Sequence, residues 1–179
     1  MTSKSSAPPR APVPNVRNRI AHFKALEFSS HGHLDTYIPG NERELVPVIG
    51  PGVLEDPSLR PAIVATDGFN VTYVRCKPGN GNALHDHETV EVFIPLTGKW
   101  KICWGEHGEE EAILEPYDVI SIPPGVHRNF RNVGDQDAMM VAIIGGNDSG
   151  KVIWAPEVLD EAKRHGVSLD EHGFIVHHK

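Results

Sequence analysis

The amino-acid sequence predicts an all-β fold for its central part, a sandwich or barrel of short antiparallel strands. Between about residues 62 and 144, short runs of β-branched and aromatic residues alternate with clusters of Gly, Pro, Asn and Asp. Seven or eight such runs in a stretch of this length are typical of a sandwich or barrel. No connecting segment can hold the crossover helix that parallel strands require, so a parallel α/β fold is excluded.

The strands follow one another closely, and turn-forming residues separate them. Asp-Gly at 67–68, Thr-Gly at 97–98 and Pro-Pro at 123–124 are among these turns. The predicted strands are 62–66, 70–76, 90–96, 99–104, 111–114, 119–122, 126–132 and 138–144.

The segment before the strands differs in composition. Residues 1–14 contain four Pro and three Ser, which is typical of a disordered arm. Further on, Val16, Ile20 and Phe23 recur at helical spacing and predict a short amphipathic helix over 16–26.

Two more elements complete the prediction. Residues 45–49 are apolar, and the sequence leaves open whether they form a loop or an extra edge strand. After residue 146, a helix is expected to begin at Pro156 and to end before Gly166, since Pro favours the first turn and Gly the position after the last. The predicted organisation is a disordered arm at 1–14, an N-terminal extension at 15–59, a β-barrel at 60–146, and a C-terminal helix and tail at 147–179.

Composition excludes several classes of function. The 179 residues include 17 Lys and Arg against 24 Asp and Glu, giving a formal net charge of −7 without a dense basic block. We therefore expect neither nucleic acid nor a membrane surface as a partner. No apolar run approaches the roughly 20 residues of a membrane helix. The first residues lack the apolar core of a secretory signal, and two cysteines give no disulfide framework, so a cytoplasmic protein is expected.

The short segment from His85 to Glu91 carries a constellation typical of a metal site. His85, His87 and Glu91 are separated by even numbers of residues, and alternate side chains of an extended strand share a face. Two imidazoles and one carboxylate that leave coordination positions open suit non-haem Fe(II), and the set also accepts Mn, Ni, Cu or Zn. His-x-His alone is common on polar strand faces, but the Glu on the same face favours a shared divalent ion over an exposed polar strand.

This stretch resembles a known family. The spacing Gly79-x5-His85-x-His87-x3-Glu91-x6-Gly98 matches the first motif of the cupin family in full. The resemblance implies a double-stranded β-helix, or jelly-roll, barrel over roughly residues 60–146. It also implies one divalent metal inside the barrel, with iron first among the candidates, and a homodimer formed through an edge strand.

The second cupin motif is matched less completely by residues 117–132. Pro123, Gly125 and Asn132 fall in register, whereas Tyr117 replaces the leading Gly. Arg128 occupies the position that usually supplies a fourth, histidine ligand.

His127 lies one residue before that position, and a shift of one residue on a strand turns a side chain to the other face. Because Phe130 is apolar, we expect Arg128 to face inward with it and His127 to face outward, although a bulge would reverse this. An inward guanidinium would weaken cation binding and could hold an anionic group. The candidate substrate contacts are therefore Arg128, Tyr73 and Phe93, which shares the strand face of Glu91.

Other histidines and the cysteines are assigned plainer roles. His31 and His33 are expected in a solvated loop, and the histidines at 177–178 in a polar tail. Cys76 and Cys103 lie on predicted strands and are expected to be small core residues.

Together these features predict a metal-binding cupin, most simply a dioxygenase-type enzyme that acts on a small anionic organic molecule. Two alternatives stay open. One is an isomerase or lyase that uses the metal as a Lewis acid. The other is a non-catalytic barrel that binds a small molecule.

Overall fold

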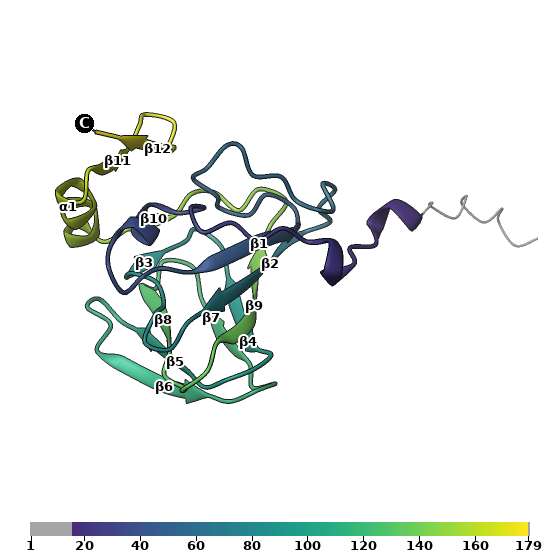
Figure 1. Cartoon of the computed structure of the whole chain (residues 1–179), viewed down its shortest axis with the longest axis horizontal. Helices are drawn as coiled ribbons and strands as arrows, with labels where there is room; N and C mark the ends of the chain where they lie inside the picture. Colours follow the sequence, from purple (N-terminus) through teal and green to yellow (C-terminus); the bar gives the residue numbers. More distant parts are fainter. Residues whose placement is uncertain (1–15, 179) are drawn as a thin grey trace, which may run out of the picture.

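The fold is all-β, as the sequence predicts, and consists of two five-stranded antiparallel sheets that face each other (Figure 1). A computed structural model describes residues 16–178, so the arm predicted at 1–14 lies outside the described residues. The first sheet has the order β1 (Glu44–Ile49), β2 (Phe69–Cys76), β9 (Ala138–Gly145), β4 (Glu91–Pro95) and β7 (Ile120–Ile122). The second has the order β10 (Ile153–Trp154), β3 (His85–Asp86), β8 (Arg128–Asn132), β5 (Trp100–Trp104) and β6 (Glu110–Leu114).

Alternation along the strands creates the core between the sheets. In β8 and β9 buried and partly exposed residues alternate strictly, because successive side chains point to opposite faces. One core cluster fills the end of the barrel formed by β4, β5 and β8, where Phe93, Trp100 and Phe130 pack edge to face.

A second core cluster attaches the C-terminal segment to the other end of the barrel. Helix α1 (Pro156–Arg164) begins at its Pro and ends just before Gly166, as predicted. It buries Val158 and Ala162 against η3 (Leu34–Tyr37) and the hairpin of β11 (Val167–Leu169) and β12 (Ile175–His177). Among the described residues, no helix is both long and apolar enough to cross a membrane.

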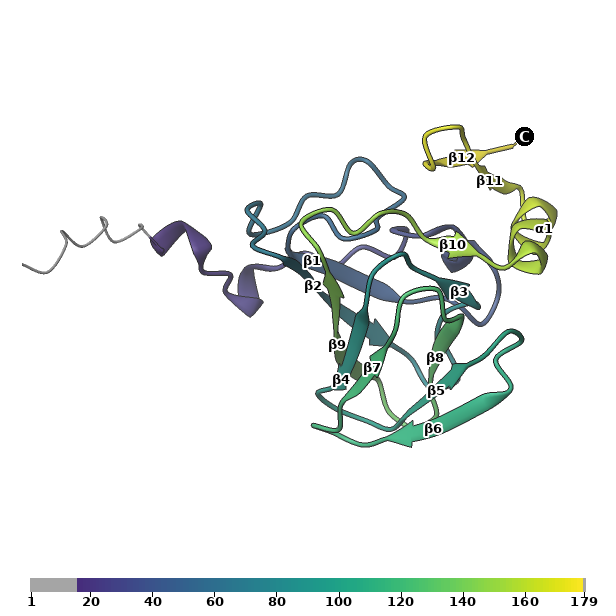
Figure 2. The same ribbon diagram turned by 180° about the vertical axis from the view of Figure 1, so that it is seen from behind.

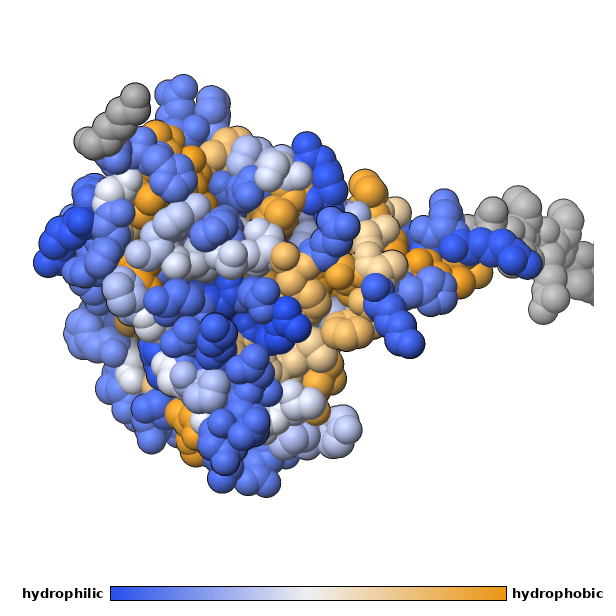
Figure 3. Space-filling view, in the orientation of Figure 1, coloured by the Kyte–Doolittle hydropathy of each residue, from blue (hydrophilic) through white to orange (hydrophobic). Residues whose placement is uncertain are grey.

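The helix predicted over 16–26 does not form. Two short 3-10 turns, η1 (Arg17–Arg19) and η2 (Phe23–Ala25), take its place. Figures 1 and 2 show both turns projecting away from the barrel, and Figure 3 shows hydrophobic colouring where they join it. Val16 and Ile20 stay 59% and 58% exposed, and of the expected apolar face Phe23 alone makes ring contacts, with Phe28 and Tyr73, in the part of the chain that the structure describes. Short helices need such packing to be stable.

Two strand predictions also change. Residues 62–66 contribute a single bridge, between Ile63 and Ile49, rather than a strand. The apolar residues at 45–49 instead belong to β1, which pairs along β2 and forms the edge of the first sheet. The predicted extension therefore supplies one strand of the sheet that surrounds the candidate site.

Candidate metal centre

A small enclosed cavity lies between the two sheets and contains the predicted ligands. His85 reaches it from β3, Glu91 from β4, and His87 from the short loop between these strands. Its walls are otherwise mostly apolar, with Phe130, Ile144 and Trp154 among them, and its volume is about 50 Å³.

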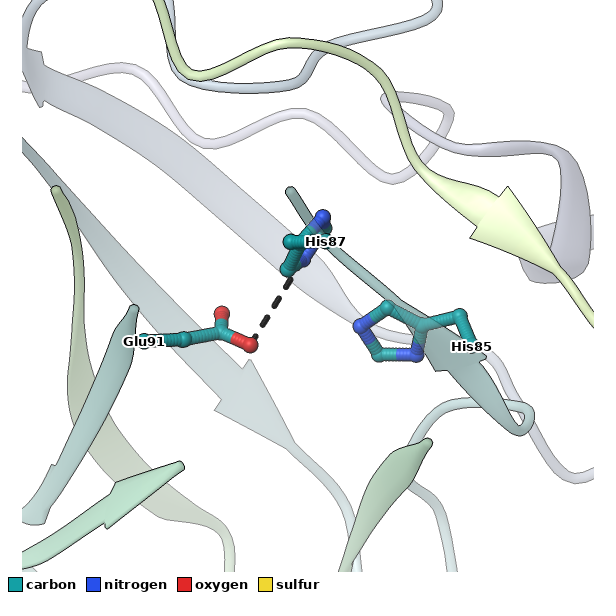
Figure 4. Close-up of side chains that lie close together, drawn as sticks. All are labelled: His85, His87 and Glu91. Atoms are coloured by element: carbon teal, nitrogen blue, oxygen red, sulfur yellow. Dashed lines mark ion pairs between the residues drawn. The ribbon is translucent and has the colours of Figure 1, made fainter. Parts of the chain in front are cut away.

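The three predicted ligands converge on one point. One potential ligand atom from each of His85, His87 and Glu91 lies within 4.8 Å of the others, and all three side chains are buried. Figure 4 shows the imidazole of His87 and the carboxylate of Glu91 turned toward each other, with His87 Nε2 3.5 Å from Glu91 Oε2. The imidazole centroids of His85 and His87 are 4.9 Å apart. Two nitrogens and one carboxylate form a donor set that fits a divalent transition metal.

Backbone carbonyls orient both imidazoles. His85 Nδ1 lies 2.9 Å from the carbonyl oxygen of Ala83, and His87 Nδ1 lies 3.5 Å from that of Lys151. A carbonyl accepts only from a protonated nitrogen, so the His85 ring carries its proton on Nδ1 and keeps a lone pair on Nε2. A carbonyl on the outer nitrogen is the arrangement commonly found around metal-binding histidines.

Burial also keeps these histidines in the form that binds metal. Desolvation lowers the pKa of His85 well below its ordinary value, and nearby His87 and Arg128 lower it further. Desolvation lowers the pKa of His87 as well, although the Glu91 carboxylate opposes the shift. Both rings are therefore neutral near pH 7, as a metal ligand must be.

The structure turns Arg128 inward and His127 outward. Arg128 is fully buried, and its Nε donates to Glu91 Oε2 at 2.9 Å while its Nη1 donates to the carbonyl of Val126 at 2.9 Å. Its Nη2 is buried without a partner among the described residues. His127 lies 3.6 Å from Asp86 on the outer face.

Arg128 is therefore not the open fork that the sequence suggested, because two of its three nitrogens are already engaged. It lies behind Glu91 and is not among the side chains that line the cavity. Of its three nitrogens, Nη2 alone is buried without a partner among the described residues.

The other two predicted substrate contacts lie elsewhere. Phe93 is fully buried and packs against Phe130 at a centroid distance of 5.5 Å, within the core cluster beside the cavity. Tyr73 points to the outer face of β2, where its ring contacts Phe23 at 5.8 Å. Its neighbours Thr72 and Val74 have the opposite orientation and line the cavity instead.

One wall of the cavity is formed by residues that no sequence pattern indicates. His33, Arg43 and Leu45 from the N-terminal extension line it, although His33 was expected in a solvated loop. His33 keeps part of its surface in solvent, but its Nδ1 is buried without a partner. Only the folding of this segment back over the barrel mouth brings these residues to the site, and local patterns do not encode such a contact.

A buried ion pair ties the extension to the ligand strand. Nη1 and Nη2 of Arg43 donate to the carboxylate of Asp35, at 2.9 and 2.8 Å. Asp35 Oδ2 also accepts from the backbone N–H of Ala83 at 2.8 Å. Since the carbonyl of Ala83 orients His85, the pair acts on the position of a predicted ligand.

Comparisons with known proteins agree with this architecture. The family model described as Cupin domain matches residues 72–144, which include all three candidate ligands. No curated protein sequence matches the chain at a significant level. The cupin resemblance noted in the sequence is therefore confirmed by the family model and by the solved structures that share the fold.

Three solved structures illustrate the likeness. The polyketide cyclase RemF from Streptomyces resistomycificus is 17% identical, with a TM-score of 0.58 over 76% of this chain and 84% of that one. The DMSP lyase DddQ from Ruegeria pomeroyi DSS-3 is 16% identical, with a TM-score of 0.56 over 74% and 62%. A cupin 2 domain-containing protein from Halorhodospira halophila is 18% identical, with a TM-score of 0.52 over 69% and 77%.

These identities show a common fold and no more. The match covers 62% of the length of DddQ. It covers 52% of the length of the chain that matches in the crystal structures of the DMSP lyases RdDddP and RnDddQII.

Proposed function

Because this chain carries a cupin domain, we propose that it binds one divalent metal ion through His85, His87 and Glu91. The observation that carries the proposal is the convergence of three buried donor atoms within 4.8 Å, with the His85 imidazole held in the tautomer that frees Nε2. Iron is the first candidate, since two histidines and one carboxylate suit non-haem Fe(II), while Mn, Ni and Zn fit the same donors.

We further propose that the protein is a metal-dependent enzyme of dioxygenase type that acts on a small anionic organic molecule. Three protein ligands leave positions free on an Fe(II) ion, which would supply the capacity to bind substrate and activate O₂. The residues of the chain orient both imidazoles through backbone carbonyls and limit the size of what enters.

The charges around the cavity support an anionic ligand. Glu91 is paired with Arg128, and Asp35 is paired with Arg43, so each of these buried carboxylates is already neutralised. A divalent cation added to these two pairs leaves an excess charge of about +2 in a low-dielectric enclosure. An anion that enters the cavity would offset that excess, and Arg128 Nη2 offers a further unpaired donor nearby.

The size of the cavity supports a small ligand. One water needs roughly 10–15 Å³ of such space. A volume of about 50 Å³ therefore admits a few water-sized groups and is far below the several hundred Å³ typical of drug-sized ligands.

The solved relatives leave the reaction open. RemF is named a polyketide cyclase and DddQ a DMSP lyase, but a fold hosts many chemistries and both are under 20% identical to this chain. A Lewis-acid isomerase or lyase is therefore the second candidate. A non-catalytic binding barrel is the third, favoured by Arg128, which occupies the fourth-ligand register and would weaken the hold on a cation.

Anaerobic reconstitution separates these candidates. The full chain is loaded with Fe(II), and O₂ uptake is measured with a panel of short carboxylates. The proposal predicts uptake that depends on one of the carboxylates and is lost in His87→Ala. His127→Ala is the matched control, because this neighbouring histidine faces outward, and it should keep both metal and uptake.

Three other results would redirect the assignment. Turnover without O₂ that also occurs with Zn(II) would establish the Lewis-acid alternative. Carboxylate binding without turnover under any metal would establish the binding barrel. Failure of the wild-type chain to retain any divalent metal would contradict the proposed centre itself.

A further inference from the structure

One side chain from the N-terminal extension faces the cavity without a role in the proposed centre. His33 lines the same cavity as His85, His87 and Glu91, although the sequence places it about fifty residues before them. Its Nδ1 is buried and has no hydrogen-bond partner among the described residues. A buried polar group left unpaired lowers stability by roughly 1–3 kcal/mol, so such a nitrogen calls for a partner that enters the cavity.

The backbone around His33 is fixed on both sides, so its position is not that of a free loop. The hydroxyl of Thr36 donates to the carbonyl of His33 at 2.6 Å, which closes the turn at the start of η3. The next N–H along the chain, from Leu34, donates to the buried carboxylate of Glu55 at 2.6 Å. Asp35, one residue further, accepts from the backbone of Ala83.

His33 also lies within electrostatic reach of the centre. Burial lowers the pKa of its imidazole well below the ordinary value, and the charges of Arg43 and of a protonated His87 lower it further. The ring is therefore neutral near pH 7, with one nitrogen that donates and one that accepts.

We infer that His33 is a ligand-recognition residue, which hydrogen-bonds the end of the bound molecule that lies away from the metal. This inference rests on the proposed metal centre and goes beyond it, because it assigns a contact and a ligand class. A hydroxyl group suits the unpaired Nδ1 in either tautomer, since a hydroxyl both donates and accepts. The ligand class that fits is a short hydroxycarboxylate, with its carboxylate toward the cation and its hydroxyl toward His33.

The size of the cavity limits this ligand to a few non-hydrogen atoms. Its volume of about 50 Å³ corresponds to roughly three to five water-sized groups. Acetate and glycolate have this size and differ by one hydroxyl, so the pair isolates the contact that His33 would make.

The test measures the affinity of both anions for the Zn(II)-loaded full chain by calorimetry. We expect the wild-type chain to prefer glycolate over acetate. We expect His33→Leu to reduce that preference about tenfold, the value of one hydrogen bond of ordinary strength, and His33→Gln to retain part of it. Zn(II) affinity should be nearly unchanged in both variants, and neither should lower the thermal midpoint, because His33 Nδ1 makes no hydrogen bond to the described residues.

His31→Leu is the matched control. His31 is an exposed histidine two residues away that stacks on Tyr37 rather than facing the cavity. It should leave the preference for glycolate unaltered.

The outcomes that overturn the inference differ from failure of the proposed centre. A preference for glycolate that persists in His33→Leu would arise at the metal itself and would overturn the role of His33. Absence of binding by either anion to the Zn(II)-loaded chain would overturn the ligand class. Absence of Zn(II) binding by the wild-type chain would instead remove the proposed centre, before any anion is added.

Discussion

Arg128 occupies the position at which the cupin family usually has a fourth, histidine ligand. The contacts of Arg128 explain how a cation can be tolerated there. Its Nε holds Glu91 Oε2 at 2.9 Å, so the guanidinium charge is already balanced by one candidate ligand. The remaining contacts of that carboxylate, such as His87 Nε2 at 3.5 Å, also involve Oε2. The second oxygen, Oε1, makes no hydrogen bond to the described residues and stays available to a cation.

Replacement of Arg128 by Leu should therefore alter stability and metal binding in opposite directions. Without metal, the variant leaves the buried Glu91 carboxylate unpaired, and the free energy of unfolding should fall by about 3–5 kcal/mol. With metal, the variant should bind Zn(II) more tightly than wild type, because a nearby positive charge is gone. Denaturant unfolding with and without Zn(II), together with a Zn(II) titration, measures both effects.

Lys101→Leu serves as the control for charge loss. Lys101 pairs with Glu111 at 3.2 Å on the surface of β5 and β6, so its loss should change stability by less than about 1 kcal/mol and leave metal affinity alone. Equal or weaker Zn(II) binding by Arg128→Leu would show that the guanidinium does not oppose the cation.

The predictability of single residues depended on whether local periodicity determines their direction. The spacing of His85, His87 and Glu91 predicts that they meet, and the structure brings them together. They come from β3, the following loop and β4, which belong to different sheets, and not from one face of a single strand as the parity argument expects. The direction of Tyr73 could not be predicted, because β2 has partly buried residues on both faces and its pattern does not show which face lies inward. His33 could not be assigned at all, since its contact with the cavity depends on how a distant segment folds.

At the scale of elements, η3 and β1 act as a bridge between the extension and the ligand strand. Asp35 on η3 and Arg43 just before β1 form a bidentate pair, and the same Asp35 holds the backbone of Ala83 before β3. The extension thus contributes to the position of His85 through Ala83.

Replacement of Asp35 by Asn should test that bridge. The variant leaves Arg43 buried without its charge partner, and the free energy of unfolding should fall by about 3–5 kcal/mol. Metal affinity should fall as well, because His85 loses part of its support, and loss of a residue that orients a metal ligand typically weakens metal binding about 10–100-fold. Both are measured by denaturant unfolding and by a Zn(II) titration.

Glu44→Gln is the control, since Glu44 belongs to an exposed pair with Arg75 on the adjacent strands. It should change stability by less than about 1 kcal/mol. Unchanged metal affinity in a folded Asp35→Asn protein would show that the extension does not support the proposed metal centre.

Glu55 joins η3 to β10 through its buried carboxylate and should give a pH-dependent stability. Its carboxylate accepts from the N–H of Leu34 and from Nε1 of Trp154, each at 2.6 Å. Burial raises the pKa of Glu55 from 4.5 to about 7, against the opposing effect of these two donors. The folded protein therefore holds this proton to a higher pH than the unfolded chain does.

The sign of the effect follows from proton uptake. Between about pH 4.5 and pH 7 the folded state binds more protons, so the Glu55 contribution to the free energy of unfolding falls as the pH rises. The fall is on the order of 3 kcal/mol across the window.

Denaturant unfolding of the metal-free wild type and of Glu55→Gln at several pH values measures this contribution. The difference between the two proteins removes the effect of the buried histidines, which titrate in both. A difference that does not vary with pH from about 4.5 to 7 would contradict the assignment.

Helices and strands were predictable where the sequence carried both a periodic apolar pattern and turn-forming or terminating residues at its ends. Helix α1 lies between Pro156 and Gly166, and most strands between β2 and β9 begin and end within two residues of their predicted positions. The helix over 16–26 failed because periodicity alone does not provide a surface to pack against. The sequence does not decide whether residues 45–49, which belong to β1, form a loop or a strand, because an edge strand with one neighbour has a weak pattern of its own.

At the scale of the whole molecule, the site is assembled from three parts of the chain. The cupin domain provides His85, His87 and Glu91, the extension provides His33 and Arg43, and the segment after β9 contributes Val152 and Trp154 to the wall. The family pattern predicts the first part, since it lies within one motif. The other parts depend on tertiary packing between segments that are far apart in sequence. The boundaries predicted at 59/60 and 146/147 stay predictions.

The most direct test of the metal centre is anomalous X-ray scattering from crystals of the full chain soaked with Zn(II) or Fe(II). The account predicts one strong peak inside the barrel, bounded by Nε2 of His85, Nε2 of His87 and the carboxylate of Glu91. The peak should disappear in His87→Ala and remain in His127→Ala. A peak only at other positions, or none in a soaked crystal whose solution contains excess metal, would contradict the account.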